Sequence, residues 1–324
     1  MVTPPLRLGL LSTAKINDAL LAGLPASVEI VAVASRDQKR AQAYARDRGI
    51  ERSHGSYEAL LADPDVEAVY ISLPNGLHHE WTMRALTAGK HVLCEKPYSR
   101  RPAEVEEAWA LAAGGGLVVA EAFMYRHHPQ VRRAKELVEA GAIGRLRVIR
   151  SSFSVRLLDL DDHRMKPELD GGALMDIGCY CVNASRLLGG EPERVLGEQV
   201  LAPSGVDVDF HGTLRFPGDV VARFDASFSL PSWQRVEAVG EEGTLVLDAP
   251  FRSDWGFALS LVRGEEVEIV DVPQADSYRL ELEDFSAAVR GEREPLLGRD
   301  DALGQARTIA ALYSSAETKA AVAP

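Results

Sequence analysis

Short, wholly apolar runs alternate with stretches of helical periodicity in the first 120 residues, and this alternation limits the possible folds more than any other feature. The apolar runs are Leu6–Leu11, Val28–Ala34, Ala68–Leu73, His91–Cys94 and Leu117–Ala120. Strands that are apolar throughout are buried on both faces, and the helices between them supply the cover. The pattern therefore predicts a doubly wound α/β domain with a parallel sheet, of the Rossmann type, over residues 1–121.

The pattern changes in the remainder of the chain, residues 122–324. Strand follows strand from Arg194–Leu201 to Val267–Val272, with short glycine-bearing hairpin connections. Two helices end the sequence, Tyr278–Val289 and one that Asp300 is expected to cap. This half predicts an α+β domain: a large, mostly antiparallel open sheet with helices against one face.

Composition excludes several classes of protein. The formal net charge is -12, whereas a nucleic-acid or anionic-membrane partner favours a basic face. No apolar run reaches the roughly 18 residues that a membrane span needs, and Met1–Leu6 carries no export signal. Cys94, Cys179 and Cys181 lack paired CxxC spacing, which favours buried, reduced thiols. We expect a cytoplasmic protein without nucleic-acid or membrane partners.

The residues after the first strand are candidates for a phosphate loop, because ligands of doubly wound sheets bind at the carboxyl ends of the strands. They are Ser12, Thr13, Ala14, Lys15 and Ile16. A glycine fingerprint would place glycines where this chain has Ser12, Ala14 and Asn17. Small residues at the first two positions still let a pyrophosphate approach the backbone, but an ordinary strand–helix turn would look the same.

The second strand ends in Ser35-Arg36-Asp37, with Lys39 close behind. An acid at this position would bind the ribose hydroxyls of NAD, while an arginine favours the 2′-phosphate of NADP. Arg36 and Lys39 favour NADP. Asp37 is the counter-argument, although the role of helix N-cap would suffice for it.

Polar clusters also follow the next two strands, at Leu73-Pro74-Asn75 with His78, and at Glu95-Lys96-Pro97. A lone lysine before proline is usually a solvated turn, but two clusters on the ligand side of adjacent strands indicate a site. The histidine pairs His78-His79 and His127-His128 do not predict a metal centre. Adjacent helical histidines point to different faces, and no acid or cysteine completes a ligand set.

Four motifs occur in the order and spacing of one family: Pro74-Asn75-x-x-His78, Gly89 to Pro97, Glu121 to Pro129, and Gly171 to Tyr180. The chain resembles the Gfo/Idh/MocA family of glucose–fructose oxidoreductases and inositol dehydrogenases over nearly its whole length. It is most similar to the branch of NADP-dependent D-xylose dehydrogenases and dimeric dihydrodiol dehydrogenases.

The resemblance implies hydride transfer between NADP (or, less favoured, NAD) and a carbinol carbon of a sugar, such as a D-xylose-like aldose or pyranose, or of a cyclic diol. It implies that the catalytic residues are Lys96, Asp176 and Tyr180. The cofactor contacts it implies, together with the strand-end positions above, are Ser12, Thr13, Ala14, Lys15, Ile16, Ser35, Arg36, Lys39, Leu73, Pro74, Asn75, His78, Glu95, Lys96 and Arg164. Substrate contacts would come from Lys96, Tyr125, His163, Asp176 and Tyr180. Many relatives carry Trp-Arg where this chain has His163-Arg164, so the role of His163 is open.

The proposed catalytic residues suit the chemistry. Oxidising a carbinol requires a base, and free tyrosine, with a pKa near 10, is a poor one at neutral pH. A nearby lysine ammonium lowers the tyrosine pKa. Asp176 and Tyr180 are four residues apart, on one face of a helix expected to begin near Met175. The structural alternative is Asp176 as a first-turn helix charge and Tyr180 as a core residue.

The second sheet has helices enough for only one face. Val148, Phe224, Phe228 and Leu245 are apolar candidates for its other face, and relatives assemble through this sheet, so we expect a homodimer or homotetramer.

The alternative functions are a ketosugar reductase, a family enzyme with a tightly bound cofactor, and an inactive nucleotide sensor. Retention of Lys96, Asp176 and Tyr180 together disfavours the sensor.

Overall fold

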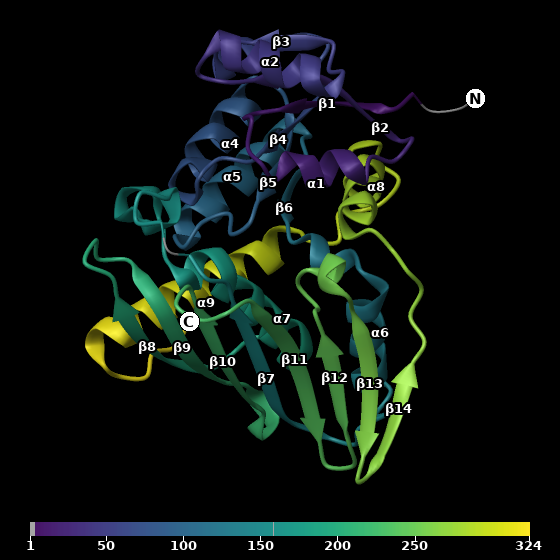
Figure 1. The fold of residues 1–324 in the computed structure, drawn as a ribbon, viewed down its shortest axis with the longest axis vertical. Helices are drawn as coiled ribbons and strands as arrows, with labels where there is room; N and C mark the ends of the chain where they lie inside the picture. Colours follow the sequence, from purple (N-terminus) through teal and green to yellow (C-terminus); the bar gives the residue numbers. More distant parts are fainter. Residues whose placement is uncertain (1–3, 158) are drawn as a thin grey trace. The chain divides into compact units, whose positions relative to one another are not determined.

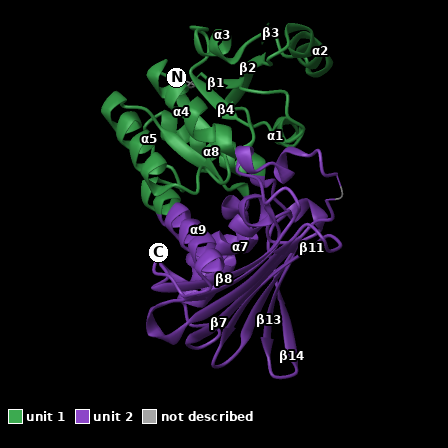
Figure 2. Cartoon of the chain, turned by 90° about the vertical axis from the view of Figure 1, so that its left-hand side faces the viewer, with its two compact units in different colours: residues 1–124, 278–303 green, residues 125–277, 304–324 purple. Residues whose placement is uncertain are grey.

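A computed structural model describes residues 4–157 and 159–324, and the chain divides into two compact units (Figures 1 and 2). Unit 1 comprises Met1–Met124 and Tyr278–Leu303, and unit 2 comprises Tyr125–Ser277 and Gly304–Pro324. The sequence placed the whole of residues 122–324 in the second domain. The structure differs from that division because Tyr278–Leu303 packs with the N-terminal half.

Unit 1 contains a six-stranded parallel sheet of order β3-β2-β1-β4-β5-β6, which confirms the predicted Rossmann-type fold. Its strands are β1 Leu6–Leu10, β2 Val28–Ala34, β3 Arg52–His54, β4 Ala68–Ile71, β5 His91–Glu95 and β6 Val119–Ala122. Its helices include α1 Asn17–Ala22, α2 Gln38–Arg48, α3 Tyr57–Leu61, α4 His78–Thr87 and α5 Pro102–Gly115. Only β3, a polar edge strand of three residues, has no counterpart in the sequence pattern, since it contains no apolar run.

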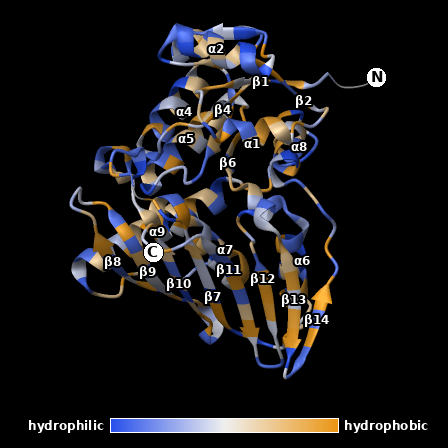
Figure 3. Ribbon diagram, viewed as in Figure 1, coloured by the Kyte–Doolittle hydropathy of each residue, from blue (hydrophilic) through white to orange (hydrophobic). Residues whose placement is uncertain are grey.

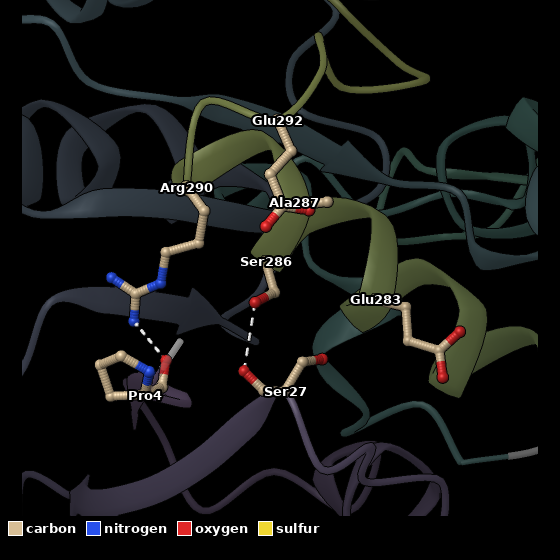
Figure 4. Close-up of a pocket in the computed structure, with 7 residues that line it drawn as sticks. All are labelled: Pro4, Ser27, Glu283, Ser286, Ala287, Arg290 and Glu292. Carbon is tan, nitrogen blue, oxygen red and sulfur yellow. Dashed lines mark hydrogen bonds between the residues drawn. The ribbon is translucent and has the colours of Figure 1, made fainter. Parts of the chain in front are cut away.

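Helix α8, Ser277–Val289, packs on the core of unit 1 although it lies far from it in the sequence. Leu282 and Phe285 are buried in the same apolar cluster as Leu6 and Tyr70. Polar groups of the helix also bind the start of the sheet (Figure 4). Ser286 Oγ donates to the Ser27 carbonyl oxygen at 3.1 Å, beside a small pocket that contains no predicted site residue.

Unit 2 is an eight-stranded sheet of order β14-β13-β12-β11-β7-β10-β9-β8, mostly antiparallel as predicted, with β7 and β10 pairing in parallel. Its strands are β7 Leu146–Ser154, β8 Arg194–Leu201, β9 Asp207–Arg215, β10 Val221–Ser227, β11 Trp233–Gly240, β12 Thr244–Asp248, β13 Ala258–Arg263 and β14 Glu266–Val270. Its helices include α6 Pro129–Glu139 and α7 Cys179–Gly189, and the division between the units falls inside α9, Arg299–Thr318. Because α9 begins at Arg299, Asp300 lies in its first turn and is not the cap.

Side chains of most strands in the unit-2 sheet, such as β10 and β11, alternate between a buried and an open face, and the strands show mixed hydropathy (Figure 3). The expectation that Phe224, Phe228 and Leu245 line the open face is wrong, because all three are buried. Only Val148 of the predicted set is partly exposed. The period-2 pattern identifies two faces but does not say which of them the helices cover.

Candidate active site

A buried hydrogen-bond network holds the loop after β1. Ser12 Oγ donates to the Ser72 carbonyl oxygen at 3.0 Å, Ser72 Oγ donates to Asn17 Oδ1 at 2.7 Å, and Asn17 Nδ2 donates to the Ser12 carbonyl oxygen at 2.9 Å. Asn17 and Ser72 were not among the predicted site residues. The network fixes the start of the predicted phosphate loop against the end of β4. A glycine in place of Ser12 would lack the hydroxyl that makes this contact.

The other residues of this loop remain accessible. Thr13, Ala14 and Ile16 are partly exposed and Lys15 is exposed, while the Ala14 N–H donates to Ser12 Oγ at 3.0 Å. The loop therefore combines an anchored first residue with backbone and side chains that a ligand can reach.

The residues after β2 form a positively charged end of the sheet. Ser35 is buried, whereas Arg36 and Lys39 are exposed. Burial raises the pKa of Tyr57. The positive charges of the nearby Arg36 and Arg40 oppose that rise. Asp37 is the N-cap of α2, as predicted, since its Oδ1 accepts from the Arg40 N–H at 2.8 Å.

His78 links the loops that follow β4 and β5. Its ring is fully buried, with Nε2 2.7 Å from the Leu73 carbonyl oxygen and Nδ1 2.9 Å from the Pro97 carbonyl oxygen. Pro74 precedes a short 3-10 turn, Asn75–Leu77, whose residues are partly exposed. The ring of His78 thus lies between two backbone segments that carry predicted cofactor-binding residues.

Glu95 and Lys96 lie half-buried at the end of β5, and the Lys96–Pro97 peptide bond is cis. Glu95 accepts a hydrogen bond from the Tyr70 hydroxyl through Oε1 and one from the Lys96 N–H through Oε2, the latter at 3.2 Å. The Glu95 carboxylate is therefore hydrogen-bonded to the backbone of Lys96, the residue that carries the ammonium group.

In unit 2, Asp176 is paired with Arg164: Arg164 Nε lies 2.9 Å from Asp176 Oδ2. The guanidinium also contacts Asp162 at 3.1 Å, and Asp176 is the main cause of a raised Arg164 pKa. The structure pairs Arg164 with the predicted catalytic carboxylate, while its contact with the cofactor stays a prediction.

The double glycine, Gly171-Gly172, makes this pairing possible. A Cβ on Gly171 would collide with the Arg164 carbonyl oxygen, and one on Gly172 would collide with Asp207 Oδ1. Gly172 also has a φ of +118°, which few other residues adopt. Because the Gly172 N–H donates to the Arg164 carbonyl oxygen at 2.9 Å, the Arg164 segment is held against the turn that carries Asp176.

The expected regular helix near Met175 is instead a π-helical turn, Leu174–Gly178, followed by α7. Asp176 lies in the π-helical turn and Tyr180 in the first turn of α7. Asp207, which sequence reasoning missed, accepts the Leu174 N–H at 2.6 Å and the Tyr313 hydroxyl at 2.9 Å. Only the three-dimensional fold brings β9, which contains Asp207, to this turn.

Tyr180 is surrounded by aromatic rings. Its ring centroid lies 5.7 Å from that of Tyr125, 5.6 Å from that of Phe153 and 5.4 Å from that of Phe251. Tyr125 is itself buried, and its hydroxyl donates to Asn183 Oδ1 at 2.6 Å. These rings limit the rotamers of Tyr180 and exclude water from most of its surface.

His163 Nδ1 lies 3.2 Å from Asp162 Oδ1, and partial burial, followed by the charge of Arg164, lowers the pKa of its imidazole. At neutral pH the ring is therefore mainly uncharged.

The predicted catalytic residues divide between the units: Lys96 belongs to unit 1, and Asp176 and Tyr180 belong to unit 2.

Two negative findings apply to residues 4–157 and 159–324. They contain no group of three or more His, Cys, Asp or Glu side chains that could hold a metal ion. Within the same ranges, no helix has both the length and the apolar character needed to cross a bilayer.

The fold and the strand-end residues define a class of protein, a Rossmann-fold oxidoreductase. A model described as "Oxidoreductase family, NAD-binding Rossmann fold" matches residues 11–123, and one described as "GFO/IDH/MocA C-terminal domain" matches residues 131–246. The chain belongs to the GFO/IDH/MocA family of oxidoreductases. The predicted family and the prediction of an enzyme are confirmed.

Individual relatives match over most of their length. D-xylose 1-dehydrogenase (NADP(+)) 2 of Haloferax volcanii is 41% identical over 320 residues, which cover 97% of this chain and 98% of that protein. Trans-1,2-dihydrobenzene-1,2-diol dehydrogenase of Bos taurus is 36% identical, covering 81% and 79%. The crystal structure of a 3-ketoreductase from Actinomadura kijaniata in complex with NADP and TDP-benzene matches with a TM-score of 0.90 and 32% identity, covering 96% and 98%.

Proposed function

We propose that this enzyme oxidises a carbinol carbon of a sugar, an aldose or pyranose resembling D-xylose, with NADP as hydride acceptor. The observation that carries the proposal is Asp176, oriented by Arg164 and followed four residues later by the enclosed Tyr180. Similarity to the Haloferax D-xylose dehydrogenase supports a sugar substrate. A cyclic diol presents the same carbinol group, and similarity to the bovine diol dehydrogenase supports that variant.

NADP is favoured over NAD by the residues after β2. Arg36, Lys39 and Arg40 are exposed, and a 2′-phosphate would find three positive charges there. Asp37 Oδ1 already accepts a backbone hydrogen bond as helix N-cap, which reduces its availability to ribose hydroxyls. The Haloferax relative is an NADP(+) D-xylose dehydrogenase and the Actinomadura 3-ketoreductase was crystallised with NADP, and both support the same choice.

The reaction needs a base for the substrate hydroxyl, and we assign this role to Tyr180 Oη. NADP, when bound, supplies the acceptor for the hydride. We assign Lys96 the task of stabilising the phenolate form of Tyr180, since a neighbouring ammonium lowers a tyrosine pKa. Asp176, held by Arg164, would accept a hydrogen bond from a second substrate hydroxyl and so orient the reacting carbon.

A ketosugar reductase is the second candidate. The same three side chains serve reduction when Tyr180 donates its proton, and the likeness to the Actinomadura 3-ketoreductase favours this direction. A family enzyme with a tightly held nicotinamide would use the same residues without net cofactor turnover.

A substrate panel separates these functions. Aldoses, inositols and dihydrodiols with NADP, and ketosugars with NADPH, are assayed by nicotinamide absorbance. We expect steady NADPH formation with an aldose, fastest with pentoses. Reduction of ketosugars without oxidation of any carbinol would replace the first candidate by the second. Redox between two sugars without released NADPH would indicate a tightly held cofactor.

We also propose that two or four copies assemble through the open face of the unit-2 sheet. Val221, Val148 and Val239 are neighbours on β10, β7 and β11, and all three are partly exposed. A second copy that presents the same row would bury it symmetrically.

The three buried thiols, which form no disulfide, support a reducing cytoplasmic location.

A further inference from the structure

Helix α8 carries a buried acid that the proposed mechanism does not use. Glu281 is 2% exposed, and among the residues that the structure describes no donor reaches either of its carboxylate oxygens. Buried carboxylates are normally paired with a cation or with several donors, because an isolated charge in a protein interior is very costly. The unpartnered position of Glu281 is therefore a property to be explained.

The acidic neighbours of Glu281 are Glu95 of β5 and Asp284 one turn along α8. Asp284 accepts the Leu296 N–H at 2.9 Å and pairs with Arg293 at 3.0 Å. Glu95 accepts the Tyr70 hydroxyl and the Lys96 N–H. Both neighbours thus have groups that stabilise a negative charge, and Glu281 has none within the described ranges.

Neighbouring like charges cannot all be maintained in a dry interior, so one acid keeps its proton. Burial, and then the charges of Glu95 and Asp284, raise the pKa of Glu281 well above its usual range. Tyr70 also faces this cluster; burial and the Glu95 charge raise its pKa, so it remains a hydrogen-bond donor to Glu95. The proton therefore belongs on Glu281.

We propose that Glu281 is a neutral carboxylic acid in the folded enzyme and a positioning residue that lets Glu95 keep its negative charge beside Lys96. The part that concerns Glu95 rests on the proposed function, in which Glu95 contacts the cofactor. The protonation of Glu281 stands independently of that function. Glu281 touches neither of the reacting groups assigned above, and it acts through Glu95.

A neutral Glu281 links folding of the chain to the uptake of a proton. In the unfolded chain the carboxyl of Glu281 loses its proton near pH 4.3, roughly its ordinary pKa. Its folded pKa is higher, so its contribution to stability is complete below the unfolded pKa and is lost as pH rises toward the folded pKa. Between these two values, the unfolding equilibrium constant of the parent rises about tenfold per pH unit through this one group.

Glu281→Gln removes this linkage while keeping a neutral side chain of the same size. Urea unfolding of parent and variant is measured at pH 5.5, 6.5 and 7.5. We expect the ratio of the parent's unfolding constant to the variant's to increase with pH, by as much as about tenfold per pH unit below the folded pKa. The exposed Glu292→Gln is the control, and its ratio should stay constant. A constant ratio for Glu281→Gln would overturn the proposal, because it would mean that Glu281 is ionised in the folded protein.

Infrared spectroscopy gives a readout that does not depend on reversible unfolding. At pH 7 the parent should show the C=O stretch of a protonated carboxylic acid, and Glu281→Gln should lack it. Absence of this band in the parent would also overturn the proposal. Both measurements use the enzyme without cofactor or substrate, so their failure is distinguishable from failure of the proposed function.

The positioning role is tested by the pH dependence of NADP affinity in the intact enzyme. Affinity should fall at acid pH as Glu95 gains a proton, and this fall should have the same midpoint in the parent and in Glu281→Gln, because both carry a neutral group. A midpoint about one pH unit lower in the variant would show that Glu281 was charged and would refute the role assigned to it.

Discussion

Arg164 and Asp176 form an ion pair, Nε to Oδ2 at 2.9 Å, that joins the segment before the double glycine to the π-helical turn. The pair fixes the orientation of a half-buried carboxylate. We expect Arg164→Gln to lower kcat/KM about ten- to a hundredfold, because the carboxylate loses its orientation. Steady-state kinetics with the best substrate of the panel measure this. Arg150→Gln, on the sheet of the same unit, is the control; equal losses in both variants would contradict a specific role for Arg164.

Removing the assigned base should abolish most oxidation. Tyr180→Phe and Lys96→Met are each expected to reduce kcat about a hundred- to ten-thousandfold, since both disrupt one proton transfer. The double variant should be little worse than either single variant, because the two residues act as one unit. NADP binding by Tyr180→Phe, followed by fluorescence titration, should remain close to parental, because Tyr180 is not among the predicted cofactor contacts. Near-parental turnover of Tyr180→Phe would mean that another group accepts the proton, and His163 is the next candidate.

Arg36→Ala should weaken NADP binding far more than NAD binding. A charge-assisted phosphate contact contributes roughly 1.5–3 kcal/mol, or about a ten- to hundredfold change in affinity. Titrations with both cofactors measure the effect. Arg46→Ala, an exposed change in the last turn of α2, serves as control and should alter neither affinity. Equal affinity of the parent for the two cofactors would sink the assignment.

Glu67 should contribute a pH-dependent stability to unit 1. Burial alone would raise the pKa of Glu67, but Arg290 and the Arg7 N–H hold it below its usual value. Because the folded pKa is depressed, the contribution is present above the unfolded pKa and is lost as pH falls through the folded pKa. We expect Glu67→Gln to cost about 1–3 kcal/mol at pH 7 and much less near pH 3.5, as measured by urea unfolding. A cost that does not change with pH would contradict this account.

The open sheet face predicts an oligomer in solution. X-ray scattering at micromolar concentration should give the mass of a dimer or tetramer, and Val148→Asp should shift it toward the monomer, because a buried row would gain a charge. Leu111→Asp, at an exposed position of α5 in unit 1, is the control and should leave the assembly unchanged. A monomeric parent would refute the proposal.

The two sheets could be predicted from the sequence because their signals are local. The run Val28–Ala34 matches β2 in both bounds, since a buried strand is determined by neighbouring residues. The place of α8 could not be predicted, because the spacing of Leu282 and Phe285 indicates an apolar helix face but not which sheet that face covers.

Some residues of the candidate site could likewise be predicted from the sequence, and others could not. Strand-end residues such as Glu95 and Arg36 follow from topology, because parallel strands end at one edge of their sheet. Asp207 and Ser72 have no motif, and their importance arises from hydrogen bonds to residues 33 and 55 to 60 positions away in the sequence. The π-helical turn also escaped prediction, because its residues keep the spacing of an ordinary helix.

The return of α8 to the N-terminal sheet has a consequence for synthesis of the chain on the ribosome. When Met124 has emerged, the core that contains Leu6 and Tyr70 still lacks Leu282 and Phe285. At roughly 5–20 residues per second, about 10–30 seconds pass before α8 follows. During that interval the nascent dinucleotide-binding half carries an apolar surface that only the last third of the polypeptide can cover, which makes it a natural client for chaperones.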